Sequence, residues 1–196
     1  MKQAITACLL CGNTLQPVRS WWQLLSNQLA PTLCEACYSN FEPAQTDALF
    51  TYNEAMKAWL NQYKILGDVQ LAHSFRTELA RALKTTAIIV PIPVHPAKLE
   101  RRTFAQVDML LDCAGIRYTH YLCKVEDSTQ GLRNRAERLA SANPFTLAPN
   151  KSATGKHFIV FDDIKTTGTT LRQACEVLQQ AGAASVKTFT LSASEL

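Results

Sequence analysis

One stretch of the sequence decides the fold class and the kind of site: Phe158-Ile159-Val160-Phe161-Asp162-Asp163-Ile164-Lys165-Thr166-Thr167-Gly168-Thr169-Thr170-Leu171. Its apolar beginning predicts a buried parallel strand. Two adjacent carboxylates and a hydroxyl-rich turn with one glycine follow, and a helix is predicted after them. Because ligands of open α/β sheets bind beyond the carboxyl ends of such strands, the stretch predicts a ligand site at this turn.

Each part of this turn suits a phosphorylated sugar. Gly168 lets the backbone approach a ligand closely. Hydroxyls and the free N–H groups of the next helix can hold a phosphate, and the hydroxyls belong to Thr166, Thr167, Thr169 and Thr170. Asp162 and Asp163 offer acceptors for ribose hydroxyls or for a divalent cation. The simpler alternative is a strand that ends at an Asp-capped turn, but turn chemistry explains one Asp and one Thr, not the whole pattern.

Length and composition describe an ordinary globular protein. The 196 residues are enough for one full domain and a small satellite. A hydrophobic content of 47% with 18% charged residues is typical of soluble domains, and the net charge of +4 is compatible with nucleic-acid or phosphate ligands. No apolar run approaches the roughly 18 residues of a membrane span, and the first residues lack a signal-peptide pattern, so we expect a cytoplasmic protein.

Four of the seven cysteines form two Cys-x-x-Cys pairs, Cys8 with Cys11 and Cys34 with Cys37. Each pair can place two thiolates on one cation, and two pairs complete a tetrahedral Zn²⁺ site. Buried or disulfide-bonded cysteines are the alternative, but an odd count in a reducing compartment favours metal. With all four positions filled by protein, zinc would fold the segment rather than catalyse.

The cysteine pairs predict a zinc-finger module over residues 1–46, ahead of a main domain over residues 47–196. Trp21 and Trp22 could stack on the bases of a single strand. We expect them instead in the core of the module, because so short a segment has little else to bury.

Apolar patterns predict the remaining elements of the main domain. Strands are expected over 48–52, 87–94, 118–123 and 185–191. Helices are expected between Asn53 and Gly67, from Leu71 to Leu83, from Leu99 to Ala114 and from Leu171 to Ala181. Two basic segments, 98–102 and 129–138, are either solvated faces or sites for an anionic ligand, since guanidinium groups bind phosphate bidentately.

The order of the motifs resembles the ComF family of late competence proteins. It runs from the cysteine quartet through Tyr63-Lys64-x-x-Gly67-Asp68, Val90-Pro91-Ile92-Pro93, Arg101-Arg102-Thr103-Phe104-Ala105-Gln106 and the 130–138 segment to the acid and threonine loop. That loop by itself resembles the signature of type I phosphoribosyltransferases. The resemblance covers essentially the whole chain.

The resemblance implies an α/β fold, with a type I phosphoribosyltransferase-like parallel sheet flanked by helices and a small four-cysteine zinc module. It implies that the zinc ligands are Cys8, Cys11, Cys34 and Cys37. The phosphoribosyl site would consist of Asp162, Asp163, Thr166, Thr167, Gly168, Thr169 and Thr170, with Asp162 and Asp163 as the catalytic pair. Mg²⁺ would accompany phosphoribosyl pyrophosphate. Lys64, Arg102 and Gln106 fall on motif positions that could contact pyrophosphate or DNA.

The family also implies a role in natural transformation. The chain would handle single-stranded DNA together with a ComFA-like helicase or translocase, in the cytoplasm, with recruitment to the inner membrane face through the uptake machinery. Three departures touch the regions near the pyrophosphate and acceptor sites. Thr103 and Ala105 replace the family's glycine and asparagine, Ser141 stands where an asparagine is expected unless Asn143 serves, and Lys165 replaces an apolar or aromatic residue. Two alternatives therefore stay open. One is an active phosphoribosyltransferase with a nitrogen acceptor in a GntX-like metabolic role, and the other is a zinc-scaffolded interaction module with a vestigial site.

Overall fold

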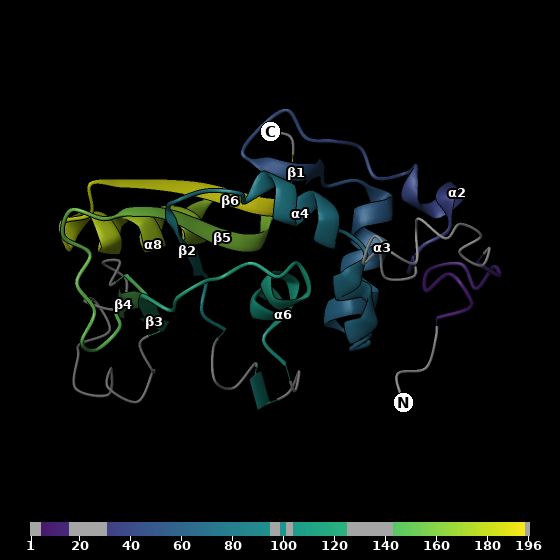
Figure 1. Ribbon diagram of the computed structural model, residues 1–196, viewed down its shortest axis with the longest axis horizontal. Helices are drawn as coiled ribbons and strands as arrows, with labels where there is room; N and C mark the ends of the chain where they lie inside the picture. The colour runs from purple at the N-terminus through teal and green to yellow at the C-terminus, as the bar shows by residue number, and fades with distance from the viewer. Residues whose placement is uncertain (1–4, 16–30, 95–98, 101–103, 125–142, 195–196) are drawn as a thin grey trace, which may run out of the picture.

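The computed structural model describes residues 5–15, 31–94, 99–100, 104–124 and 143–194 (Figure 1). Its main sheet is parallel throughout, in the order β1-β6-β5-β2. The strands are β1 (Ala48–Thr51), β2 (Ile88–Pro91), β5 (His157–Lys165) and β6 (Ser185–Ala193). In the register of the sheet, Phe161 of β5 lies between Pro91 of β2 and Phe189 of β6. A separate antiparallel pair joins β3 (Leu122–Lys124) to β4 (Phe145–Leu147).

Helices cover both faces of this sheet. On one face, α8 (Thr169–Gln180) packs into a buried cluster with Phe158 and Val160. On the other face, Ile89 and Phe161 join a cluster with α3 (Glu54–Lys64), η1 (Val69–His73), α4 (Arg76–Ala82) and α6 (Gln106–Cys113). Neighbouring residues of a strand point to opposite faces, so Val160 and Phe161 separate the two clusters. The predicted α/β class with a helix-flanked parallel sheet is confirmed. Among the described helices, none has the length and apolar character needed to cross a membrane.

The helix predictions hold best where local signals are strong. The Asn53 side chain accepts a hydrogen bond from Met56 N over 3.1 Å, so α3 begins at the predicted cap. The single helix predicted from Leu71 to Leu83 is wrong, because η1 and α4 are separate helices. The break lies at Ser74, whose Oγ lies 2.8 Å from Thr32 Oγ1 and accepts a hydrogen bond from Trp59 Nε1 at 3.3 Å. Tertiary contacts thus override the helical period.

The helix predicted from Leu99 to Ala114 is also shorter than expected, since α6 begins at Gln106. The residue before it, Ala105, has an extended backbone with φ −86° and ψ 106°. The strand predicted at 118–123 is likewise displaced: β3 begins at Leu122, while Tyr118 makes an isolated parallel bridge with Ile89 at the edge of the main sheet.

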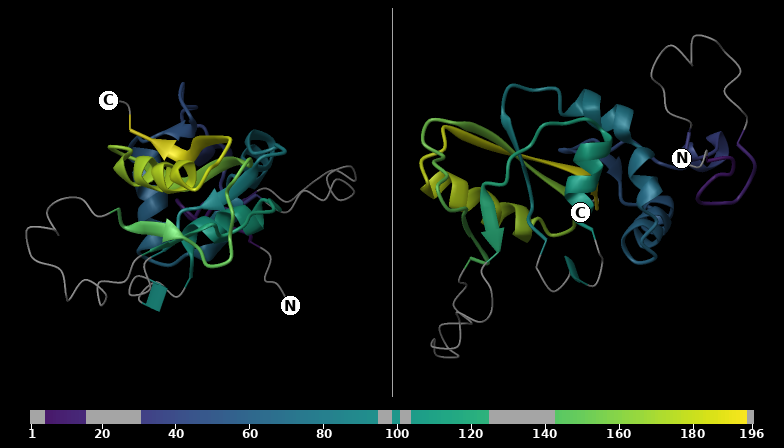
Figure 2. Two further views of the ribbon diagram at one scale, coloured as in Figure 1. Left: turned by 90° about the vertical axis from the view of Figure 1, so that its left-hand side faces the viewer. Right: turned by 60° about the horizontal axis from the view of Figure 1, so that its bottom comes forward.

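The four-cysteine segment and α2 (Glu35–Tyr38) lie at one end of the molecule, and α8 lies at the other (Figures 1 and 2). The segment shares its core with the main domain, because Cys8 and Phe41 belong to the same buried cluster as Trp59. Tyr38 OH donates to Glu78 Oε1 on α4 over 2.7 Å. A division at residue 46 stays a prediction, and Trp21 and Trp22 lie outside the described residues.

Candidate functional site

The two acids of the signature lie within β5 rather than beyond it, because this strand continues to Lys165. Its neighbour β2 ends at Pro91, after which Ile92 N donates to Phe161 O over 2.9 Å. Further along, the N–H of Asp163 donates to Asp162 Oδ1 at 2.9 Å. The Asp162 carboxylate thus supplies a partner for a backbone N–H just past the end of the neighbouring strand.

Asp163 makes an ion pair with a lysine that lies about 100 residues earlier in the chain. Lys64 Nζ, on the last residue of α3, lies 2.7 Å from Asp163 Oδ2, and the two side chains are 17% and 8% exposed. The pKa of the half-buried Asp162 is raised to about 8. The main cause is burial, and the second is the negative charge of Asp163. A carboxyl that keeps its proton at neutral pH can donate as well as accept hydrogen bonds, which suits sugar hydroxyls.

The threonine loop turns from β5 into α8 through Gly168, whose φ of +71° lies in the left-handed region. Thr167 Oγ1 lies 3.0 Å from Thr169 Oγ1 and accepts from Thr169 N at 3.4 Å. All four loop threonines are exposed, and residues 164–171 line a hollow of ≈ 30 Å³. Hydroxyls therefore gather at the start of a full-length helix, where the helix dipole and free N–H groups favour an anion.

Lys165 does not point its charge into this loop. Its Nζ donates to Asp47 Oδ1 at 2.8 Å, and Thr188 Oγ1 donates to the other oxygen of Asp47. Burial raises the pKa of Asp47, but the hydrogen bonds from Lys165 and Thr188 outweigh it and lower the pKa below its ordinary value. No sequence pattern predicts the roles of Asp47 and Thr188, because these roles depend on the order of strands in the sheet.

The other predicted contacts lie in different surroundings. Gln106 is 2% exposed and its Nε2 donates to Phe104 O, so burial excludes a direct ligand contact for Gln106 in this conformation. Lys64 reaches the acid pair itself, as described above. Arg102 and the basic segment 129–138 lie outside the described residues.

The four predicted zinc ligands converge. The Sγ atoms of Cys8, Cys11, Cys34 and Cys37 all lie within 4.8 Å of one another. Cys11 Sγ and Cys34 Sγ are 3.7 Å apart, close to the edge of about 3.8 Å for a tetrahedron with metal–sulfur bonds of about 2.3 Å. The first pair is held in a tight turn, where Cys8 N donates to Asn13 O and Gly12 N donates to Cys8 O, each at 2.8 Å. The second pair flanks the start of α2.

The electrostatics of this cluster are those of a cation site. Burial alone would raise the pKa of the Cys8 thiol. Hydrogen bonds from the surrounding backbone N–H groups outweigh burial and lower this pKa to about 6. Burial and the neighbouring thiols raise the pKa of Cys37 far above its usual range. Four adjacent thiols cannot all ionise without a positive charge between them, so the donor set fits a metal ion.

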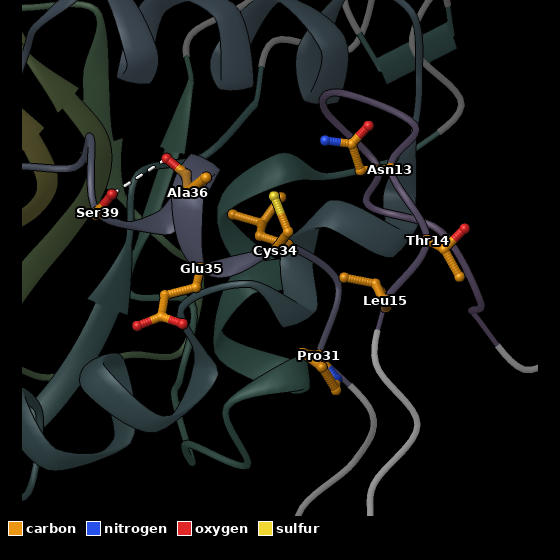
Figure 3. A pocket seen from close by; sticks show the side chains of 9 residues that line it. Asn13, Thr14, Leu15, Pro31, Cys34, Glu35, Ala36 and Ser39 are labelled. Atoms are coloured by element: carbon orange, nitrogen blue, oxygen red, sulfur yellow. Dashed lines mark hydrogen bonds between the residues drawn. The ribbon is translucent and has the colours of Figure 1, made fainter.

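A wide hollow of ≈ 890 Å³ opens beside the cysteine cluster, with Asn13, Leu15, Cys34 and Glu35 around it (Figure 3). Its one charged lining residue among the described residues is Glu35.

Comparison with known proteins agrees with this geometry. Residues 123–194, which include the acid pair and the threonine loop, match the family model described as a phosphoribosyl transferase domain. The chain is 33% identical over 217 residues to competence protein ComFC of Streptococcus pneumoniae, an alignment that covers 94% of this chain and 98% of that protein.

Two further relatives are similar over most of this chain. Competence protein ComFC of Bacillus subtilis is 33% identical over 153 residues, which cover 75% of this chain and 63% of that protein. DNA utilization protein YhgH of Escherichia coli is 26% identical over 192 residues, which cover 93% of this chain and 77% of that protein.

Proposed function

This chain belongs to the ComF family of competence proteins, and from this membership we propose that it assists the uptake of single-stranded DNA in natural transformation. The observation that carries the proposal is the match to pneumococcal ComFC over 98% of that protein's length. The relation to a DNA utilization protein supports the same role. The mild positive charge of the chain is compatible with a phosphate backbone as ligand.

The pocket at the end of β5 is proposed to bind phosphoribosyl pyrophosphate or a related ligand. Asp162 and Asp163 would hold the ribose hydroxyls, and the exposed hydroxyls of the threonine loop would hold the 5-phosphate at the N-terminus of α8. Mg²⁺, when bound with this ligand, would neutralise the pyrophosphate. The proposal includes binding and not turnover, because the fold alone does not establish transfer to an acceptor.

The cysteine cluster is proposed to hold a structural Zn²⁺. Thiolates select zinc among the common divalent ions, and four protein ligands leave no open coordination position for chemistry. A ComFA-like translocase is the proposed partner of the chain, and contact with it would recruit the chain to the inner membrane face.

The proposal is tested by a paired titration of the purified chain, with phosphoribosyl pyrophosphate plus Mg²⁺ and with single-stranded DNA. We expect saturable binding of both ligands and a steep loss of DNA affinity with salt. Thr169→Val together with Thr170→Val removes two hydroxyls at nearly constant volume and should weaken donor binding, while Thr146→Val on β4 serves as the matched control. Absence of DNA binding at low salt, with and without a ComFA-like partner, would overturn the DNA role.

The same titration separates the alternatives. An active transferase would consume the donor when a nitrogen base is added, whereas the proposed binding role leaves the donor intact. A zinc-scaffolded module with a vestigial site would bind its partner but would show no donor binding, and its partner affinity would be indifferent to Thr169→Val and Thr170→Val.

A further inference from the structure

The last turn of α3 contacts three separate parts of the molecule through three consecutive residues. Gln62 Nε2 donates to Leu9 O, between Cys8 and Cys11, over 2.5 Å. Tyr63 OH donates to Gln106 O, the first residue of α6, over 2.7 Å. Lys64 Nζ reaches Asp163 of β5 at 2.7 Å.

Helix geometry explains how one turn can do this. Successive residues of an α-helix are rotated by about 100°, so neighbours in sequence do not share a face. Gln62 therefore points to the cysteine turn while Lys64 points to the sheet, and the ring of Tyr63 is fully buried between them. The next two side chains make no comparable buried contact, since Ile65 and Leu66 are 63% and 73% exposed. The anchored part of the helix thus ends at Lys64.

The contact at Lys64 is the one that touches the ligand site. Its ammonium is largely buried, and its partner Asp163 adjoins Asp162, which turns back onto the N–H of Asp163. A charge pair with so little exposure fixes the direction of the Asp163 carboxylate, because rotation of that side chain would leave both charges unpaired in a low-dielectric site.

We propose that Lys64 is the positioning residue of the acid pair, and that the last turn of α3 couples the ribose-phosphate site to the four-cysteine cluster. This inference rests on the proposed donor binding. Lys64 acts through Asp163 and does not contact the phosphates of the donor. By linkage, a donor that stabilises the acid pair also stabilises the cysteine turn held by Gln62, and metal at the cysteines favours donor binding in the same proportion.

The test uses the full zinc-loaded chain with Lys64→Met, Lys64→Arg and Gln62→Ala. Lys57→Met is the control, because Lys57 lies on the same helix, is 60% exposed and pairs with the exposed Glu54. Two quantities are measured: the affinity for phosphoribosyl pyrophosphate with Mg²⁺, and the rate of zinc release to a chromogenic chelator with and without this donor.

We expect Lys64→Met to weaken donor affinity about tenfold and to remove the slowing of zinc release by the donor. Lys64→Arg should restore part of both effects. Gln62→Ala should keep donor affinity within about twofold, but the donor should no longer slow zinc release in this variant. If Lys64 had a purely structural role, Gln62→Ala would leave the slowing of zinc release unchanged. Lys57→Met should behave as wild type.

Each remaining outcome decides the inference. A folded Lys64→Met chain with wild-type affinity and coupling overturns it. If Lys64→Met does not fold, wild-type coupling in Gln62→Ala overturns it instead. If the wild type binds no donor, the proposed donor binding fails by itself. The coupling is then judged by the rate of zinc release in the absence of donor. Equal release rates in Lys64→Arg, Gln62→Ala and Lys57→Met would overturn the coupling.

Discussion

Lys165 Nζ lies 2.8 Å from Asp47 Oδ1, so the residue before the threonine loop is held by the residue before β1. This pair explains why a lysine can occupy a position where the family has an apolar or aromatic residue. The charge is directed to Asp47 and Thr188, and the loop keeps its exposed hydroxyls.

Asp47→Asn should lower the free energy of unfolding by about 0.5–1 kcal/mol at pH 7, a small value because solvent screens a pair that is about one third exposed at both ends. The pKa of Asp47 is lowered in the fold, so its contribution is present above the ordinary carboxyl pKa of about 3.9 and is lost as the pH falls through the folded value. Urea unfolding at pH 7 and pH 3 checks this. A difference between variant and wild type that is unchanged at pH 3 would contradict it.

The effect of Asp162→Asn on stability should depend on pH in the opposite direction to that of Asp47→Asn. Because the pKa of Asp162 is raised to about 8, the folded chain keeps a proton that the unfolded chain releases above about pH 4. Wild-type stability from this group therefore falls as the pH rises from about 4 to about 8. The variant lacks this slope and should gain on the wild type over that range in thermal unfolding curves. Parallel curves for both chains would show that Asp162 titrates normally.

Gly168→Ala should destabilise the chain by about 1–2 kcal/mol, because an alanine at φ +71° meets the steric cost of the left-handed region. Space is not the limit, since the nearest atom to an added Cβ is the Lys165 Cε at 3.5 Å. The same change should weaken donor binding, as the loop leaves its observed conformation. Gly155→Ala is the control: its φ is +70° with no atom within 4 Å, but it lies outside the loop, so it should cost stability and spare donor binding.

Zinc removal should unfold the end of the molecule that carries α2. We expect one zinc per chain by elemental analysis, and a fall in the melting temperature of about 10 °C after chelation or in Cys37→Ser, which corresponds to a loss of about 4 kcal/mol. Cys175→Ser on α8 is the matched control, since this cysteine packs in the other core cluster. Full thermal stability of the metal-free chain would contradict a structural metal.

The sequence predicted the parts of the site that are contiguous in the chain. The strand, the acids, the threonine turn and the helix after it follow from local rules of spacing and backbone freedom. The cysteine cluster followed from ligand chemistry, because two closely spaced pairs have few other uses in a reducing compartment.

The rest depended on contacts that no local pattern records. Lys64 and Asp163 meet only in the folded chain, where the last residue of α3 reaches β5, and nothing in the spacing of Lys64 distinguishes it from a solvated lysine. Gln106 lies in a motif next to basic residues, yet it is buried because Tyr63 and Phe104 hold the start of α6 against the core. Ser74 breaks a helix for the same reason.

The pairing of β1 with β6 has a consequence for how the protein is made. β1 is the first described strand in sequence order and its parallel partner β6 is the last, so their pairing waits until all the other described strands have been made. All four cysteines leave the ribosome before β1 does. The residues of the proposed metal site are therefore all present in the nascent chain before any strand of the parallel sheet has been made.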